Sequence, residues 1–468
     1  MTAPAEPSAP VDVAAVVAHL REGALSGLLD GEAARVTQLR QLRRLLTEQR
    51  ERLEAALASD LGKPPVEGYA TEIGFTVTEI DHVIAHLRDW MQPEKVRVPV
   101  AFRPGTATVM RQPLGLVLVI APWNYPVQLT LAPLVAALAA GNAVVVKPSE
   151  LSPATSSALA ELVPQYLDSR VVAVVEGAVA ETTALLAEAF DHIFYTGNGT
   201  VGRVVMRAAA EHLTPVTLEL GGKCPAIVAG DADIDVAARR IAWGRFTNAG
   251  QTCVAPDYVL VTADVEDRLL GALLRAVHDF YGEHPAASAD YGRIVNERHF
   301  DRLMGLLDAG GFDAVVTGGN GDRSTRYLAP TVLAGVAPDA AVMGEEIFGP
   351  ILPVIAVADV DSAVDFVNAR DHPLALYVFT GNAALAERTL ERTRSGGAGV
   401  NNVMMHLAVS ELPFGGVGAS GTGAYHGRTG FETFSHRRSV LSKPTKPDPS
   451  LLYPPYKRWK ETILRRVL

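Results

Sequence analysis

The spacing of apolar residues divides the chain into a helical first part and a longer part built from short apolar runs. Residues 11–92 carry apolar positions three and four apart, as along EAARVTQLRQLRRLLTEQRERLEAALASDLG, where Gly62 is a stop signal. Residues 1–10 have no such periodicity, and we expect them to be disordered. The pattern therefore predicts a group of helices before the first strand.

From about residue 106, apolar or β-branched runs end in Gly, Pro or Ser, and each is followed by a helix-like segment. The runs are residues 114–122, 143–149, 171–177, 192–197 and 216–222. Such alternation is typical of βαβ units around a buried parallel sheet. Ligands bind beyond the carboxyl ends of the strands in these sheets, so the turns after the runs are the candidate positions.

A second alternation begins near Asp231. Its pattern predicts helices at 234–247 and 264–280 and strands at 257–262, 313–317 and 351–356. A glycine-rich segment at 413–427, a proline-rich linker and a short basic tail follow. The 468 residues are too many for one simple core, and two α/β regions agree with that length.

Composition and charge exclude several classes of protein. The chain is 48% hydrophobic with a net charge of -10, which disfavours general nucleic-acid binding. The N-terminus lacks the basic start and apolar core of a signal peptide. The most apolar window, residues 127–146, is interrupted by Gly141 and Asn142, so it predicts a buried helix, a turn and a strand rather than a membrane span.

The two cysteines, Cys224 and Cys253, allow no disulfide framework, and no metal-type spacing surrounds them. A reducing, cytoplasmic compartment fits. Cys253 lies in NAGQTC, in a loop where nucleophiles are common, and from this hexapeptide a nucleophile and a structural thiol are equally supported. Glu219, between two leucines, is a candidate general base that should be partly desolvated and have a raised pKa, or it is a solvated glutamate at a strand end, which the local sequence alone favours. Asn124 in APWNYP is a candidate oxyanion donor or a simple turn-former.

Two turns are candidates for holding a cofactor. Lys147, Ser149 and Glu150, in KPSE, follow an apolar run where lysine and glutamate can hold ribose hydroxyls. Residues 197–202 spell G-x-G-x-x-G between a strand and a helix, the context of a dinucleotide fingerprint. A lone match is weak, and three βα units precede this one.

The chain resembles the aldehyde dehydrogenase superfamily, class 3, through motifs that occur in the family's order between residues 121 and 418. The motifs are PWNYP, KPSE, FYTGN, LELGGK, NAGQTC, EEIFGP and PFGGVG. The resemblance implies that Cys253 is the nucleophile, Asn124 the oxyanion-hole amide and Glu219 the general base. Either Glu219 or Glu346 then activates the water that releases the acid.

The resemblance also implies the contacts of a nicotinamide cofactor, NAD or NADP. Lys147 and Glu150 match adenosine-ribose contacts, and Glu346 and Phe348 match groups that hold the nicotinamide ribose and ring. The family's counterpart of 197–202, which includes Gly197, Asn198 and Gly202, lies beside the cofactor phosphates, so the spelled fingerprint is a coincidence. Cys224 stands where relatives often carry Ser, and we expect it to be inert.

The implied fold is α/β, with a Rossmann-like cofactor domain, an α/β catalytic domain and a small β oligomerisation element. We assign residues 1–95 and 108–222 to the first, 223–425 to the second, 96–107 and 426–445 to the third, and 446–468 to a linker and tail. The implied substrate is a medium or long aliphatic, or aromatic, aldehyde, and the implied assembly is a homodimer. We expect Cys253 to react as a thiolate, which requires a lowered pKa.

Three alternatives stay open. A relative that passes the acyl group to coenzyme A generally lacks the glutamate that Glu219 matches. A cysteine hydrolase needs a histidine paired with Cys253, and no histidine is marked out by motif. A non-catalytic binding protein on the same fold is hard to reconcile with Asn124, Glu219 and Cys253 together.

The tail, residues 456–468, has the pattern of a short basic amphipathic helix. Its apolar positions fall at helical spacing and lysines and arginines occupy the rest. Such a helix can lie on an anionic membrane surface, but it is too short to span one. The alternative, a tail packed on a partner subunit or simply solvated, is slightly favoured.

Overall fold

The computed structural model describes residues 12–467, so the expectation for residues 1–10 lies outside it. The described chain begins with a layer of helices: α1 (Val13–Leu25), α2 (Glu32–Glu48), α3 (Arg50–Leu61), α4 (Pro65–Gly68) and α5 (Gly74–Trp90). Helix α3 ends where the sequence predicts, because Gly62 adopts the left-handed conformation (φ 60°) that ends helices. Residues Tyr69–Ile73, between α4 and α5, form a π-helical turn.

The predicted apolar runs form the first sheet, in the order β17-β7-β6-β3-β4-β5. Its strands are parallel except β17, which runs antiparallel to β7. They are β3 (Leu116–Ile120), β4 (Ala143–Lys147), β5 (Val172–Val174), β6 (His192–Thr196), β7 (Val216–Glu219) and β17 (Gly421–Thr422). The order reverses between β3 and β6, which is where open α/β sheets bind ligands.

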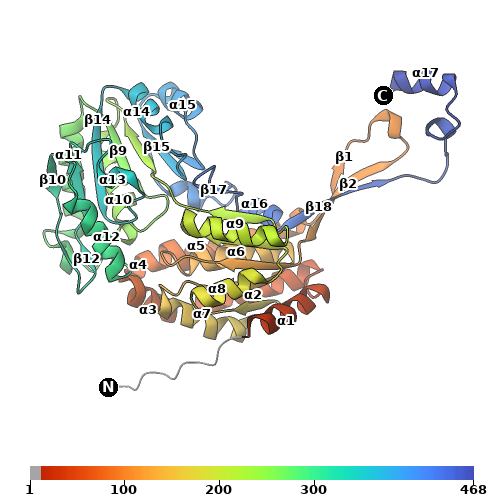
Figure 1. Ribbon diagram of the computed structural model, residues 1–468, viewed down its shortest axis with the longest axis horizontal. Helices are drawn as coiled ribbons and strands as arrows, with labels where there is room; N and C mark the ends of the chain where they lie inside the picture. The colour runs from red at the N-terminus through yellow and green to blue at the C-terminus, as the bar shows by residue number, and fades with distance from the viewer. Residues whose placement is uncertain (1–11, 468) are drawn as a thin grey trace.

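Helices cover both faces of this sheet, as Figure 1 shows. On one face lie α6 (Gln128–Ala140) and α7 (Pro153–Tyr166), and on the other lie α1, α8 (Val179–Ala187) and α9 (Gly199–Glu211). Alternate residues of β3 enter different cores: Val117 and Val119 pack with α6 and α7, whereas Leu116 and Leu118 pack with α1 and α9. The strand is therefore wholly apolar.

The second sheet has the order β10-β13-β14-β9-β8-β15-β16 and is parallel except for β10. Its strands are β8 (Pro225–Val228), β9 (Tyr258–Thr262), β10 (Ala314–Thr317), β13 (Thr331–Ala334), β14 (Ile351–Val357), β15 (Ala375–Phe379) and β16 (Gly397–Val400). The accompanying helices are α10 (Ile234–Phe246), α11 (Glu266–Tyr281), α12 (Glu297–Asp308), α13 (Ala341–Gly344), α14 (Val360–Asn368) and α15 (Ala383–Arg392). A hairpin of β11 (Gly321–Asp322) and β12 (Tyr327–Leu328) completes this region.

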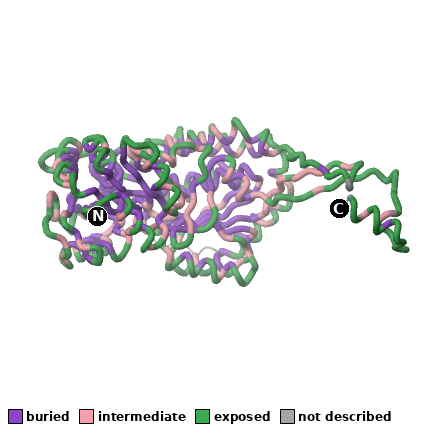
Figure 2. Tube along the Cα trace, turned by 90° about the horizontal axis from the view of Figure 1, so that it is seen from above, coloured by how far each residue is buried: buried purple, intermediate pink, exposed green. Residues whose placement is uncertain are grey.

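A third, antiparallel sheet extends away from the body of the molecule (Figures 1 and 2). It contains β1 (Glu94–Val96), β2 (Thr106–Pro113) and β18 (Ser435–Ser442), in the order β1-β2-β18, and β18 follows α16 (Gly427–Thr433). Strand β2 crosses the domain boundary that the sequence placed after residue 107, because its ladder with β18 continues to Pro113. Strand β17 joins the first sheet although it falls in the segment assigned to the catalytic domain.

The chain ends in α17 (Arg458–Val467), beyond the projecting sheet. Tyr456, which precedes α17, and Trp459 and Ile463 within it are exposed, so these apolar positions of the predicted pattern lie on the surface. Lys460, however, is buried, and its ammonium donates to the carbonyl oxygens of Ser450 and Tyr453 at 2.6 and 2.7 Å. That lysine therefore fastens the helix to the linker instead of adding to a basic outer face. Among the residues described, no helix combines the length and hydropathy needed to cross a membrane.

Candidate functional site

Four predicted positions lie at one edge of the first sheet, where its parallel strands end. The register pairs Ile120 with Lys147 and with Tyr195, and it pairs Thr196 with Glu219. The four positions are Asn124 after β3, Lys147 at the end of β4, Gly197 after β6 and Glu219 at the end of β7. The structure therefore gathers groups that are up to 95 residues apart in sequence (219 - 124) at the crevice where ligands bind in this type of sheet.

Cys253 comes to the same place from the second sheet, in the loop between α10 and β9. It is half-buried, not exposed as its loop position predicts. The loop begins with Asn248 and Ala249 in left-handed conformations (φ 54° and 51°). At Gly250 (φ 76°) a Cβ atom would lie 2.3 Å from the carbonyl oxygen of Gly349, so only glycine fits. The NAGQTC loop is thereby packed directly against the EEIFGP segment.

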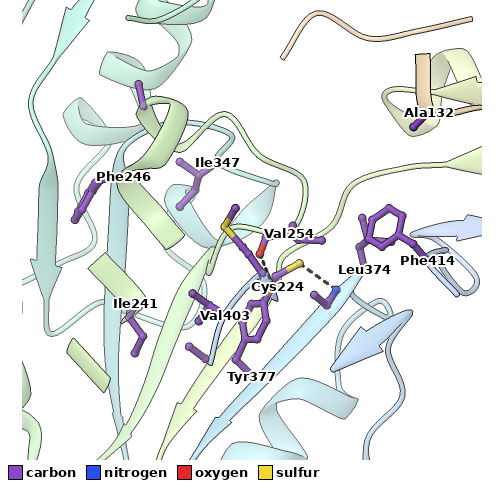
Figure 3. Packing of buried hydrophobic residues seen from close by; sticks show 14 of the residues in the cluster. Ala132, Cys224, Ile241, Phe246, Val254, Ile347, Leu374, Tyr377, Val403 and Phe414 are labelled. Atoms are coloured by element: carbon purple, nitrogen blue, oxygen red, sulfur yellow. Dashed lines mark hydrogen bonds between the residues drawn. The ribbon is translucent and has the colours of Figure 1, made fainter. Parts of the chain in front are cut away.

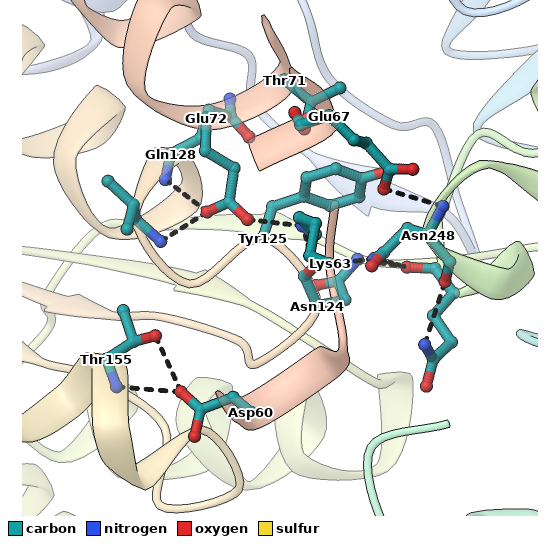
Figure 4. A network of polar contacts seen from close by, with 12 residues as sticks. Asp60, Lys63, Glu67, Thr71, Glu72, Asn124, Tyr125, Gln128, Thr155 and Asn248 are labelled. Atoms are coloured by element: carbon teal, nitrogen blue, oxygen red, sulfur yellow. Dashed lines mark hydrogen bonds and ion pairs between the residues drawn. The ribbon is translucent and has the colours of Figure 1, made fainter. Parts of the chain in front are cut away.

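Hydrogen bonds join the Cys253 loop to the turn that carries Asn124 (Figure 4). The Asn124 side-chain amide donates to the carbonyl oxygen of Gln251 at 3.0 Å. In return, the side-chain amide of Asn248 donates to the backbone carbonyl oxygen of Asn124 at 2.8 Å. An amide nitrogen carries two hydrogens, so Asn124 keeps one N–H for another acceptor. Its side chain is only 3% exposed, and this fixes its orientation.

Glu219 is buried without a partner. Among the described residues, neither of its carboxylate oxygens has a hydrogen bond, and the residue is 2% exposed. Burial raises the pKa of Glu219 well above its usual range, in the direction that its two leucine neighbours predict. A buried carboxyl group without hydrogen bonds is costly for stability alone, and functional sites are where such groups concentrate.

The expectation of a lowered pKa at Cys253 is wrong for the protein as described here. Burial raises the pKa of the Cys253 thiol, and the negative charges of Glu346 and Glu219 raise it further. Hydrogen bonds from the backbone amides of Cys253 and Val254 lower the pKa of the thiol, but by less than burial and the two charges raise it. The sulfur is therefore held as a thiol, and a base must take its proton before it attacks.

Glu346 and Phe348 face the site from the segment before β14. Asp257 anchors this segment by accepting from the Lys223 ammonium at 2.6 Å, the Arg245 guanidinium at 3.0 Å and the Ile347 amide at 3.2 Å. Glu346 packs so closely on Gly221 that a Cβ atom there would lie 2.0 Å from its carboxylate. Burial, with Asp257 second, raises the pKa of Glu346 to about 8.

This pKa predicts a pH-dependent contribution of Glu346 to stability. In the unfolded chain Glu346 ionises near 4.5, whereas in the folded protein it keeps its proton up to about pH 8. The contribution of Glu346 to the free energy of unfolding is fully present below pH 4.5, and it is lost as the pH rises from 4.5 to 8. We expect the midpoint of thermal unfolding to fall more steeply between pH 5 and 8 in the wild type than in Glu346→Gln. Parallel curves for the two proteins would show that the pKa of Glu346 is not raised.

Phe348 adopts a left-handed backbone conformation (φ 49°), which is uncommon for a bulky residue. Its ring meets Trp123 edge-on, with the ring centroids 5.3 Å apart. Trp123 lies next to Asn124 in the turn after β3. This backbone conformation therefore places the Phe348 ring against Trp123, at the edge of the first sheet.

The positions predicted to hold a cofactor lie along the same edge. Lys147 is buried, and its ammonium donates to the exposed carboxylate of Glu150 at 2.9 Å, with buried Ser149 between them. Asn198 caps α9, with its side chain accepting from the Val201 amide at 3.0 Å. The glycines pack closely: a Cβ at Gly197 would lie 2.2 Å from the Tyr195 hydroxyl, and one at Gly202 3.0 Å from Leu220.

A dinucleotide fits this set of groups. A helix N-terminus favours phosphate, and an ammonium with a carboxylate suits ribose hydroxyls. The buried hydroxyl of Thr196, at the end of β6, has no hydrogen-bond partner among the described residues and leaves a polar group for a ligand. The sheet starts with β3, not β6, so the glycine-rich turn is not the first βα turn. Within residues 12–467, no cluster of three or more metal-ligating side chains is present.

Cys224 lies beneath the Cys253 loop (Figure 3). Its thiol donates to the carbonyl oxygen of Cys253 at 3.3 Å and accepts from the Ala375 amide at 3.3 Å. Cys224 is fully buried, and burial raises the pKa of its thiol well above the ordinary value. These contacts support the expectation of an inert thiol.

Four residues in or beside the Asn124 turn and the Cys253 loop were not predicted. Lys63, Glu67 and Glu72 come from the segment between α3 and α5, and Tyr125 follows Asn124. The Tyr125 and Thr252 hydroxyl groups are hydrogen-bonded at 2.6 Å, and the backbone amide of Asn248 donates to the Glu67 carboxylate at 2.9 Å. Burial raises the pKa of Glu67 to about 7. The only sequence signal was a lysine and two glutamates beside a helix stop, which is typical of a solvated surface.

Comparison with known proteins gives one family. A sequence model of the aldehyde dehydrogenase family matches residues 13–440. Aldehyde dehydrogenase family 3 member A2 of Mus musculus is 50% identical over 441 residues, which are 94% of this chain and 90% of that protein. The dimeric NADP-preferring aldehyde dehydrogenase of Rattus norvegicus is 50% identical over 427 residues, 91% of this chain and 94% of that protein.

Solved structures agree. A substrate-bound structure of Staphylococcus aureus AldH superimposes with a TM-score of 0.95 at 41% identity, and the match covers 98% of this chain and 100% of that one. The NAD-dependent aldehyde dehydrogenase from Sinorhizobium meliloti superimposes with a TM-score of 0.86 at 32% identity, over 94% and 88% of the two chains.

Proposed function

The chain belongs to the aldehyde dehydrogenase family and is an NAD(P)-dependent aldehyde dehydrogenase, and on this premise we propose that it oxidises its substrate through a thioester on Cys253. One observation carries the assignment. The Cys253 loop is hydrogen-bonded to the Asn124 turn, and the charge of the unpaired Glu219 carboxyl group acts on the Cys253 thiol. Nucleophile, oxyanion donor and base thus meet at one point.

The first step forms a bond between the Cys253 sulfur and the aldehyde carbon. The raised pKa means that the thiol must lose its proton first. The nearby unpaired group that can take it is Glu219, whose own raised pKa makes its ionised form a stronger base than an ordinary carboxylate. As the C–S bond forms, the carbonyl electrons move to oxygen. The free N–H of Asn124 donates to that oxygen, while Gln251 holds the other N–H. A donor fixed in a buried site stabilises the developing charge without having to reorganise.

NAD or NADP, when bound, would supply the hydride acceptor needed to oxidise the hemithioacetal on Cys253 to a thioester. Lys147, Ser149 and Glu150 are placed to hold the adenosine ribose, and Gly197, Asn198 and Gly202 lie where phosphates are favoured. Glu346 and Phe348 are placed to hold the nicotinamide end from the opposite side.

The last step releases the acid. Glu219 first releases to solvent the proton that it took from the thiol. Water then attacks the thioester carbon, the C–S bond breaks, the electron pair returns to the sulfur, and Glu219 takes the proton of the water. We assign this role to Glu219 instead of Glu346, since neither of the Glu219 oxygens is engaged, whereas Glu346 is packed on Gly221 and bonded by the amide of Gly222.

The substrate class is a medium or long aliphatic, or aromatic, aldehyde. The test is the absorbance of reduced nicotinamide after wild-type protein is mixed with NAD or NADP and short, long and aromatic aldehydes. We expect reduction with long or aromatic aldehydes and no requirement for coenzyme A. Reduction only with short aldehydes would contradict the substrate class, and dependence on coenzyme A would contradict hydrolysis.

We further propose that the protein is a homodimer, joined through the projecting sheet β1-β2-β18. Support comes from the dimeric relative and from the apolar side chains that this element exposes. They are Val96, Val100, Phe102, Met110 and Leu441. Exposed apolar surface of this kind marks protein–protein interfaces.

The dimer is tested by light scattering coupled to gel filtration. We expect the wild type to have twice the chain mass of 49.7 kDa, and the double variant Val100→Asp/Leu441→Asp to have the mass of one chain. Leu213→Asp, which changes a residue that is 90% exposed on the body, should stay dimeric. A wild-type monomer, or a dimer that survives the double substitution, would exclude this interface. Membrane contact of residues 456–468 stays a prediction.

A further inference from the structure

We infer that the buried ion pair of Lys63 and Glu72 is a positioning device that fixes Asn124 for the reaction. The inference rests on the proposed function, because it gives Asn124 the role of oxyanion donor. Both side chains of the pair have no exposed surface. Lys63 comes from the short loop between α3 and α4 and Glu72 from the π-helical turn, both far in sequence from the turn they hold. A buried pair of charges is retained at a cost in desolvation, so a specific use is expected of it.

Lys63 holds the Asn124 end of the turn. Its ammonium donates to the backbone carbonyl oxygen of Asn124 at 3.2 Å and pairs with Glu72. It also lies 4.1 Å from the centroid of the Tyr125 ring, a cation–π contact with the next residue. The ammonium group therefore contacts Glu72 and two consecutive residues of the turn (Figure 4).

Glu72 holds the other end of the turn. Its second carboxylate oxygen accepts from the amides of Val127 at 2.7 Å and Gln128 at 3.3 Å, where α6 begins. The first amides of a helix have no partner inside it, and a carboxylate there satisfies them. Glu72 reaches them from the π-helical turn Tyr69–Ile73, a distortion that is frequent at functional sites.

Residues 124–128 are therefore held by two sets of contacts, one from the Lys63–Glu72 pair and the other from the Cys253 loop. The carbonyl of Asn124 receives one hydrogen bond from each side, from Lys63 and from Asn248. With its backbone fixed twice and its amide bound to Gln251, Asn124 has one orientation. Loss of the pair would let the turn shift relative to Cys253, and misplacement of about 1 Å can cost on the order of 10²-fold in rate.

A double-mutant cycle tests this inference. The proteins are wild type, Lys63→Met, Asn124→Ala and Lys63→Met/Asn124→Ala, and kcat is measured with saturating aldehyde and NAD(P). We expect Asn124→Ala to lower kcat by ~10²–10³ and Lys63→Met by roughly 10-fold or more. In the Asn124→Ala background, Lys63→Met should have less than about a 3-fold effect, because the group it positions is gone. The KM for NAD(P) should not change.

Controls separate positioning from general damage. Glu79→Gln removes another buried carboxylate that accepts from a backbone amide, that of Gly427 at 2.7 Å, and should leave kcat unchanged. Glu72→Gln keeps the shape of the side chain and serves if Lys63→Met does not fold. Equal fold-losses from Lys63→Met in both backgrounds, or a folded variant with wild-type kcat, would overturn the inference. An Asn124→Ala protein with wild-type kcat would instead overturn the proposed role of Asn124.

Discussion

Replacing Cys253 by alanine is expected to lower NAD(P)-dependent aldehyde oxidation by on the order of 10⁴-fold or more, as removal of a catalytic nucleophile does in other enzymes. Without the sulfur no covalent bond to the aldehyde forms, and the Asn124 amide and Glu219 carboxyl have no shared intermediate to act on. The rate is read from the absorbance of reduced nicotinamide. Binding of NAD(P), followed by nicotinamide fluorescence, should persist, because Lys147 and Glu150 are untouched.

Cys224→Ser is the matched control. It changes the other thiol, which is fully buried and bonded to the backbone of Cys253 and Ala375, and a hydroxyl can make both contacts. We expect this variant to keep activity within about 10-fold of wild type, because the substitution changes a residue that is hydrogen-bonded to the Cys253 backbone and leaves the reacting thiol in place. A fully active Cys253→Ala protein would refute the thioester, and equal losses in the two variants would show that the site responds to packing.

Glu219→Gln has the second-largest expected effect, a fall in steady-state rate of ~10²–10⁴. Glutamine keeps the shape of the side chain but cannot take a proton from water or from the Cys253 thiol. The substitution also removes the negative charge of Glu219, which raises the pKa of the Cys253 thiol, so hydroxide can take the thiol proton more easily. Acylation should therefore recover as the pH rises, while hydrolysis stays slow. A rapid-mixing experiment at pH 9 should then show a burst of nicotinamide reduction followed by slow turnover.

Glu346→Gln separates the two candidate bases. Glu346 contributes a charge that raises the pKa of Cys253, but it is bonded to the backbone at Gly222. We expect its replacement to leave hydrolysis of the thioester intact, with no burst. An unchanged rate in Glu219→Gln together with a burst in Glu346→Gln would move the base to Glu346.

The first sheet could be predicted from the sequence because its strands are buried on both faces. The runs 116–120 and 143–146 are wholly apolar, and polar residues mark their ends. The second sheet was predicted only in part. Strand β16 is GAGV, too rich in glycine to show a strand pattern, and β8 and β13 are four-residue strands that only their neighbours define. Helices α12, α14 and α15 were also missed.

The groups proposed to touch the reacting atoms were singled out through motifs, and the structure brings several of them to the edge of the first sheet. The pKa of Cys253 was mistaken, since burial and two negative neighbours are tertiary effects that no local pattern shows. Lys63 and Glu72 were missed for a related reason. Nine residues apart, beside a helix stop, they look like surface charges, and only the fold buries them as a pair. The sequence therefore indicated the groups proposed to react but not the residues that position them.

The central claim is the thioester on Cys253, and the most direct test is the mass of the protein itself. Glu219→Gln is mixed at pH 9 with NAD(P) and a long-chain aldehyde, quenched in acid, and weighed intact and after digestion. The account predicts an added mass equal to the aldehyde less two hydrogens, on the peptide that contains Cys253. No added mass during the burst, or an acyl group on Cys224 or another residue, would contradict it.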